Sequence, residues 1–197
     1  MRPEERRQEV LRYLEQLLSP QRYHHSLEVG RLARELAGRF GVQKDEAELA
    51  GLWHDAAKEV PMAEQIAWAK GAGLDPDVIR HAPQVLHGPL AARRWEELFG
   101  KGPEDDLIMA AVAQHTTGAP GMGKVALAVF VADFLEEGHG TGGSPEAGEV
   151  KAANTLERAG FLVARAKLSY LSGHGRWIAP DLLFCYNDLW MRTAGEE

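Results

Sequence analysis

The chain has 197 residues, of which 45% are hydrophobic and 26% charged, the composition of an ordinary folded domain. Its formal net charge of −7, without a tract of Lys or Arg, argues against binding to nucleic acid. No apolar run is long enough to cross a bilayer, and the first ten residues lack the apolar core of a signal peptide. Cys185 stands alone and cannot form an internal disulfide. These features predict a cytoplasmic protein that binds neither nucleic acid nor membrane.

Helical patterns follow one another along the whole chain, and strand patterns are nearly absent. A first helix is predicted at 4–18, and Ser19-Pro20 separates it from a second at 21–40 that ends at Gly41. Further helices are predicted at 44–57, from Pro61 to about 71, 75–80, 86–99, 104–114, 124–136, 146–171 and 180–191. The expected fold is therefore an all-α single-domain helical bundle.

That single domain is expected to span residues 1–197, with its core at about 20–136 and a C-terminal helical extension at about 144–191. The Gly-rich stretch at 138–148, GHGTGGSPEAG, is predicted to be the least structured segment and to be mobile.

Six residues carry the imidazole and carboxylate groups that bind metals, in the chain order His, His-Asp, His, His, Asp. They are His25, His54, Asp55, His87, His115 and Asp133. Each of them alone would more often be an ordinary core or surface residue, a helix cap or the partner of an arginine. The joint pattern is more informative, because imidazole and carboxylate donors without thiolates suit iron, manganese, cobalt or zinc.

The adjacent pair His54-Asp55 lies near the C-terminal end of an apolar helical stretch. Neighbouring residues of an α-helix point about 100° apart. Both side chains can therefore reach one ion only if the ion lies beyond the helix end or the last helical turn loosens. Such a pair also needs ligands from other helices.

His25 and Asp133 are predicted to be two of those ligands. His25 lies four residues before Val29 and shares its inward face, whereas His24 points elsewhere. Asp133 lies four residues after Val129, on an apolar face where a carboxylate is costly to bury alone. A metal ion would remove that cost.

Residues 22–59, RYHHSLEVGRLARELAGRFGVQKDEAELAGLWHDAAKE, resemble the core of the HD phosphohydrolase superfamily. The stretches LHGPLAA and QHTTGAPGMGKVALAVFVADFLE are similar to the YqeK family of bacterial hydrolases, which cleave dinucleoside tetraphosphates symmetrically. The resemblance implies a fold of the HD-domain type and an iron-type metal held by four residues. Those residues are His25, His54, Asp55 and Asp133.

For His87 and His115, the resemblance implies contact with the substrate phosphates or with a second metal ion, and the sequence leaves both roles open. One or two divalent ions are therefore expected. A bound ion would activate water for attack on phosphorus, with Asp55 orienting the water or bridging two ions. Lys58, one turn later, would stabilise the charge on the phosphoryl group.

Further contacts to a nucleotide are expected from residues beside these ligands. They are Arg22, Thr116, Thr117, His139 and Arg176, with Trp177 as a nucleotide neighbour and Trp53, Trp68, Trp95 and Trp190 in the core. The family usually has an arginine where this chain has His139, and histidine is a weaker phosphate partner at neutral pH.

Three functions compete on this basis. The first is symmetrical hydrolysis of diadenosine tetraphosphate to two ADP. The second is an HD phosphatase that acts on a nucleoside mono- or diphosphate. The third is a nucleotide-sensing module that keeps the metal without turnover. The oligomeric state is open, with a homodimer as one option.

Overall fold

Helices form all the regular structure in the described part of the chain, which confirms the predicted all-α fold. The structure, a computed structural model, describes residues 2–139 and 145–194, and the side chains of all of these except 137–139. The elements in chain order are α1 (Pro3–Leu17), α2 (Pro20–Phe40), α3 (Lys44–Trp53), α4 (Met62–Gly71), α5 (Pro76–His81), the 3₁₀ turn η1 (Pro83–Val85), α6 (His87–Phe99), α7 (Pro103–Gln114), α8 (Lys124–His139), α9 (Pro145–Ala152), α10 (Leu156–Gly173) and α11 (Pro180–Thr193).

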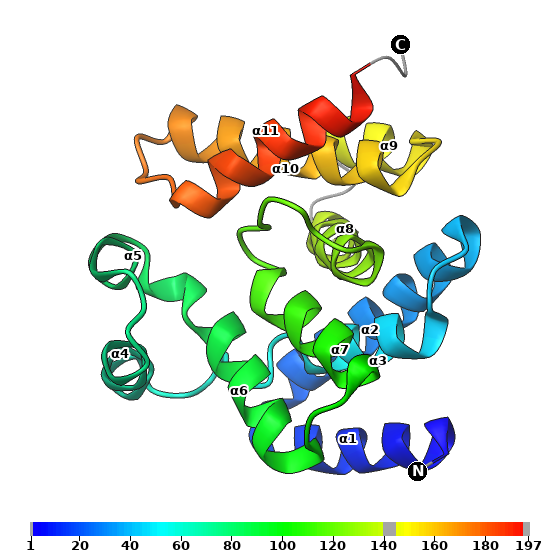
Figure 1. The fold of residues 1–197 in the computed structure, drawn as a ribbon, viewed down its shortest axis with the longest axis vertical. Helices are drawn as coiled ribbons and strands as arrows, with labels where there is room; N and C mark the ends of the chain where they lie inside the picture. The colour runs from blue at the N-terminus through cyan, green and yellow to red at the C-terminus, as the bar shows by residue number, and fades with distance from the viewer. Residues whose placement is uncertain (1, 140–144, 195–197) are drawn as a thin grey trace.

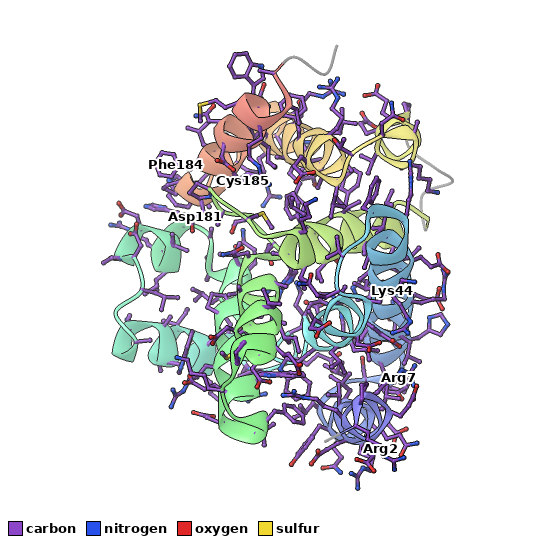
Figure 2. The ribbon with its side chains drawn as sticks, turned by 45° about the vertical axis from the view of Figure 1, so that its right-hand side comes forward. Arg2, Arg7, Lys44, Asp181, Phe184 and Cys185 are labelled. Atoms are coloured by element: carbon purple, nitrogen blue, oxygen red, sulfur yellow. The ribbon has the colours of Figure 1, made fainter. Side chains whose placement is uncertain are left out.

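Helix α8 lies at the centre of this arrangement (Figure 1). Its segment from Val125 to Asp133 is buried all round, as expected of a helix that is apolar on every side. Helices α2, α3 and α7 cover one side of α8, α9 and α10 cover the other, and α11 packs on α10 (Figure 1). Arg2, which precedes α1, and Arg7 of α1 lie at the opposite end of the molecule from Phe184 of α11 (Figure 2).

Local signals set many of the helix boundaries. Six of the α-helices begin at a proline, whose missing N–H costs nothing at the first helical position. As predicted, the Ser19 hydroxyl caps α2 by accepting a hydrogen bond from the Arg22 N–H. Gly41 ends the same helix with a φ of 67°, a left-handed conformation that favours glycine.

Helix α3 is shorter than predicted, because it ends at Trp53 instead of residue 57. The chain continues as tight turns in which the Ala56 N–H donates to the Trp53 carbonyl and the Lys58 N–H to the Asp55 carbonyl. The helix therefore loosens at the His-Asp pair, which is one of the two conditions under which both side chains can face one ion.

The prediction of one long helix at 146–171 is wrong, because the chain breaks between α9 and α10. The Thr155 hydroxyl accepts a hydrogen bond from the Arg158 N–H and caps α10. The Arg39 guanidinium from the end of α2 donates to the carbonyls of Lys151 and Ala153 and so satisfies the end of α9. A distant side chain thus supports the break.

The positions of Trp190 and of the Gly-rich stretch were also predicted from the sequence. Trp190 was expected in the core, but it lies on α11 with 55% of its surface exposed. Residues 140–144 of the stretch predicted to be mobile lie outside the described residues. In the described ranges, none of the helices combines the length and the apolar character that a membrane span requires.

Candidate metal centre

The six ligand-type residues come from five separate segments and meet in one place. His25 lies on α2, His54 and Asp55 follow α3, and His87 begins α6. His115 follows α7, and Asp133 lies on α8. All six are buried except His25, whose side chain is 11% exposed. Burying this many polar groups is costly unless each finds a partner.

Two close helix contacts bring the histidines together. A Cβ atom on Gly51 would lie 2.9 Å from the Gly30 Cα, so α2 and α3 touch backbone to backbone beside His54. A Cβ atom on Gly88 would lie 3.1 Å from the Val112 carbonyl oxygen, so α6 and α7 approach in the same way beside His87. Glycine is required at both crossings because a larger residue would separate the helices.

Every one of the four histidines has its Nδ1 atom fixed by an oxygen acceptor. The Nδ1 atoms contact Gly51 O for His54 (2.7 Å), Gln84 O for His87 (2.7 Å), Val112 O for His115 (2.8 Å) and Glu136 Oε2 for His25 (2.5 Å). Because backbone carbonyls and the ionised carboxylate of Glu136 only accept, the neutral form of these rings carries its proton on Nδ1 and leaves the Nε2 lone pair free. Such partners commonly orient metal-binding histidines.

The four Nε2 atoms converge as two pairs. In the first pair, His25 Nε2 lies 3.1 Å from His54 Nε2, and in the second pair, His87 Nε2 lies 3.0 Å from His115 Nε2. Two lone pairs facing each other at this distance repel. Each pair therefore needs a proton or a cation between its rings.

Asp55 lies between the two pairs and offers one oxygen to each. Its Oδ2 is 3.5 Å from His54 Nε2 and accepts a hydrogen bond from Arg22 at 2.8 Å. Its Oδ1 is 3.0 Å from His87 Nε2 and 3.6 Å from His115 Nε2. This buried oxygen nevertheless makes no hydrogen bond of acceptable geometry. An orphaned carboxylate oxygen among imidazole lone pairs fits a missing cation.

Asp133 completes the first histidine pair. Its Oδ1 lies 3.4 Å from His25 Nε2 and 3.5 Å from His54 Nε2. Two overlapping groups can therefore hold a metal ion, one made of His25, His54 and Asp133 and the other of His54, Asp55 and His115. The donors present, imidazoles and carboxylates, fit divalent transition metals.

The electrostatics of the cluster differ between the two pairs when no metal is bound. Burial alone would lower the pKa of His54, but the carboxylates of Asp55 and Asp133 raise it to about 9. Burial alone would likewise lower the pKa of His25, but the carboxylates of Asp133 and Glu136 outweigh it, and the pKa is raised. In contrast, burial and the neighbouring histidines lower the pKa of His115 to about 4.

The carboxylates respond in the opposite direction. Burial alone would raise the pKa of Asp55 and of Asp133, but nearby histidines hold both values well below the usual range. Both groups are therefore ionised at neutral pH. The cluster offers two negative charges at its centre, which a divalent cation would neutralise.

Lys58 and Arg22, two of the expected substrate contacts, lie at the edge of this cluster. The Lys58 Nζ is 3.3 Å from His87 Nε2 and 3.8 Å from Asp55 Oδ1. The Arg22 guanidinium contacts the other oxygen of Asp55. Both side chains are about one-third exposed, at 36% and 32%. They can therefore contact an anion that approaches from solvent.

The other expected substrate contacts are distributed unevenly. Thr116 Oγ1 lies 3.0 Å from His115 Nε2, beside the second pair. The Thr117 hydroxyl donates to the Gly118 carbonyl, one residue further on. Arg176 is exposed on the loop between α10 and α11, where its neighbour Trp177 lines a cavity. The side chain of His139 lies outside the described residues.

Two contributors were missed by the sequence interpretation. Glu136 fixes the Nδ1 atom of His25, and its position three residues after Asp133 on the same helix was the available signal. Lys167 of α10 donates a hydrogen bond of 2.9 Å to the Thr116 carbonyl. Nothing in the local pattern around Lys167 distinguishes it from a surface lysine.

The helical fold and the clustered histidines and aspartates define an all-α protein with a candidate site for one or two metal ions. A family model described as the HD domain matches residues 22–159. The chain belongs to this HD domain family, as the HDAAK segment and its surrounding helices predicted.

Relatives with known names agree with this membership. The symmetrical bis(5'-nucleosyl)-tetraphosphatase of Bacillus subtilis strain 168 is 30% identical over 181 residues, which are 92% of this chain and 96% of that protein. A protein of the same name from Staphylococcus aureus strain NCTC 8325 is 32% identical over 127 residues, 64% of each chain.

A solved structure shares the fold over almost its full length. The crystal structure of a "predicted HD superfamily hydrolase involved in NAD metabolism" from Clostridium acetobutylicum is 27% identical to this chain. It matches with a TM-score of 0.84 and covers 94% of this chain and 97% of that one. The C-terminal helices therefore belong to the shared architecture as well as the core.

Proposed function

We propose that this chain is a metal-dependent hydrolase that splits diadenosine tetraphosphate symmetrically into two molecules of ADP. The observation that carries the hydrolase assignment is the convergence of four Nε2 atoms on the two oxygens of Asp55. The names of the relatives from Bacillus subtilis and Staphylococcus aureus support the substrate class.

Two ions are proposed, one at each histidine pair. His25, His54, Asp133 and the Oδ2 of Asp55 would hold the first, and His87, His115 and the Oδ1 of Asp55 would hold the second. Iron is the proposed metal, and manganese, cobalt and zinc suit the same donors. The competing role for His87 and His115 is direct contact with a substrate phosphate. Counting the ions bound per chain separates the two.

Bound divalent ions supply a water of lowered pKa and polarise a phosphoryl oxygen. The protein itself supplies position and charge. The Arg22 guanidinium holds one oxygen of Asp55, so the carboxylate keeps a fixed orientation between the pairs. The Lys58 ammonium, about 3.3 Å from His87, lies where it can stabilise negative charge on a phosphoryl group. The Thr116 hydroxyl offers a neutral donor on the same side.

The decisive experiment is hydrolysis by purified chain loaded with iron(II), manganese, cobalt or zinc. We expect diadenosine tetraphosphate to yield ADP as its sole nucleotide product. Asp55→Ala should abolish this activity while circular dichroism stays unchanged, which would reject a sensing module without turnover. If the chain released no ADP from this substrate but rapidly hydrolysed a nucleoside mono- or diphosphate, it would instead be an HD phosphatase for those nucleotides.

A cytoplasmic location and a homodimer are finer proposals. The location is supported by Cys185, a buried free thiol of the kind that a reducing compartment maintains. Cell fractionation tests the first proposal, and light scattering of the purified chain tests the second.

A further inference from the structure

A cavity of 710 Å³ begins beside the second histidine pair and extends between two parts of the molecule. Gln84 and Val85 of the η1 segment line one side, and Lys167 and Tyr170 of α10 and Trp177 line the other. The Gln84 carbonyl also fixes the Nδ1 atom of His87. The cavity therefore borders the candidate metal centre through Gln84 and Thr116, and its volume is typical of small-ligand sites.

Aromatic rings line the end of this cavity that faces solvent. The Trp177 ring packs against His81 in a tilted arrangement, with centroids 5.6 Å apart and planes at 33°. The Tyr170 ring stacks on His174 at 4.3 Å and 36°, and Tyr170 is 60% exposed. Both rings are thus held by a neighbour while they line the cavity. Supported aromatic rings of this kind bind nucleobases by stacking, whatever the base.

The end of the cavity nearest the histidines carries polar groups suited to phosphate. Thr116 places its hydroxyl beside the second pair, and Lys167 donates to the Thr116 carbonyl. The Lys167 ammonium therefore lies close to the cavity end where a phosphate chain would enter the centre. Groups that suit a base and groups that suit a phosphate thus line one cavity.

The cavity beside the first histidine pair has a different character. It measures 290 Å³ and is lined by Arg22, His24 and His25 together with the carboxylates of Glu59 and Glu136. Among the described residues, no Trp, Tyr or Phe lines it, and its volume lies at the lower limit for a small-molecule site. Its planar groups are the Arg22 guanidinium, which donates to Asp55, the His25 imidazole, which contacts His54, and the His24 imidazole. It therefore offers a base a smaller stacking surface than the Trp177 and Tyr170 cavity does.

We infer that a dinucleoside tetraphosphate is held by only one of its two nucleosides, which stacks in the Trp177 and Tyr170 cavity. This inference rests on the proposed function. The second nucleoside leaves past Arg22 without a dedicated subsite. Although the substrate is symmetrical, its recognition is not, and the bond that breaks is counted from the nucleoside in the cavity.

A substrate with a single nucleoside should therefore suffice. In adenosine 5'-tetraphosphate, a water oxygen would bond to one of the two phosphorus atoms that flank the central bridging oxygen. The bond from that phosphorus to the bridging oxygen breaks, the bridging oxygen leaves with the other half, and the water releases one proton to solvent. The products are ADP and pyrophosphate, and no co-reactant other than water is needed.

The experiment compares the dinucleotide with adenosine 5'-tetraphosphate on metal-loaded wild type, Trp177→Leu, Tyr170→Leu and Trp190→Leu. Trp190 is the matched control, because it is an exposed tryptophan of α11 outside the cavity lining. We expect wild-type kcat/KM values for the two substrates within roughly tenfold of each other. Trp177→Leu should raise KM for both substrates by roughly 5- to 100-fold, the range expected when one base-stacking contact is lost. Its kcat should change little.

A second measurement does not depend on turnover. Calorimetric binding of ADP to the metal-loaded protein should weaken in Trp177→Leu and not in Trp190→Leu. Rapid hydrolysis of the dinucleotide without hydrolysis of adenosine 5'-tetraphosphate would overturn the inference and leave the proposed function intact. If adenosine 5'-tetraphosphate gave ATP and phosphate, the broken bond would not be counted from the nucleoside in the cavity, and the inference would also be overturned. If the wild type hydrolyses neither substrate, the proposed function fails. Separately, an unchanged ADP affinity in Trp177→Leu would show that the nucleoside does not bind at Trp177.

Discussion

The two histidine pairs are built alike and surrounded differently. In each pair, a glycine crossing brings two helices together, the Nδ1 atoms are fixed by oxygen acceptors, and the Nε2 atoms face each other at about 3 Å. The first pair, His25 and His54, has Asp133 and Glu136 beside it. The second pair, His87 and His115, contacts the shared carboxylate of Asp55, and it borders Lys58, Thr116 and the larger cavity.

This difference suits the first pair to binding a cation and the second pair to contacting a substrate. Carboxylates around the first pair raise the pKa of His54 to about 9, so the protein favours positive charge there. In the second pair, burial and the neighbouring histidines lower the pKa of His115 to about 4, so this imidazole stays neutral at pH 7. We expect the first pair to bind its ion tightly, and the second to bind an ion more weakly or to share it with the substrate phosphates.

The largest effect is expected at Asp55, because its two carboxylate oxygens face both histidine pairs. Asp55→Asn removes the negative charge and should lower activity by roughly 10³-fold, since a bound ion contributes several kcal/mol to stabilisation of the transition state. Metal content by plasma mass spectrometry should fall at both positions. Retention of one ion per chain with activity within tenfold of wild type would break the assignment of Asp55 as a bridge.

A smaller effect is expected when the pairs are disrupted one at a time. His54→Ala should leave the chain without a tightly bound ion. His115→Ala should keep one ion and lose activity by roughly 10²-fold, the order seen when one preorganised charge-stabilising group is removed. Metal analysis after gel filtration measures the difference. Equal metal loss in the two variants would show that the pairs do not differ in the proposed way.

Much of this site could be predicted from the sequence, because helical periodicity identifies which side of a helix faces inward. His25 and Asp133 were placed on inward faces by their spacing from Val29 and Val129, and the structure brings both to His54. The loosened helix end at His54 was one of the two alternatives that the angle between adjacent helical residues left open. Each of these inferences needed only local geometry.

The remainder depended on partners far away in the chain. Glu136 contacts a histidine 111 positions earlier, and Arg39 supports the break after α9 from more than a hundred positions away. Periodicity gives the direction of a side chain but does not name the residue that it meets. The single-domain boundaries and the chemical roles of the ligands stay predictions for the same reason.

Substitutions at the two glycine crossings are expected to lower the stability of the fold to different extents. Gly51→Ala places a methyl group 2.9 Å from backbone, whereas Gly88→Ala places it 3.1 Å from a carbonyl oxygen. We expect both to destabilise the fold by about 1–3 kcal/mol, with Gly51→Ala the worse. Urea unfolding gives the free energies.

Gly148→Ala is the matched control for these variants. Gly148 lies within α9, and a Cβ atom there would meet nothing within 4 Å. Alanine at this position should stabilise the fold by up to about 1 kcal/mol, the usual difference in helix propensity. If Gly51→Ala behaved like Gly148→Ala, the close contact between α2 and α3 would not be what positions the first pair.

The smallest expected effect is the pH dependence of stability in chelator-treated protein. The raised pKa of His54 gives a contribution that is complete below about pH 6.5, the ordinary value for histidine, and is lost as the pH rises through about 9. The lowered pKa of His115 has the opposite sign, so its contribution is present above about pH 6.5 and is lost as the pH falls through about 4. Urea unfolding should therefore show maximal stability near pH 6.5. His54→Gln should flatten the alkaline side alone and His115→Gln the acidic side alone, and loss of the same limb in both variants would mean that the two pairs share one electrostatic environment.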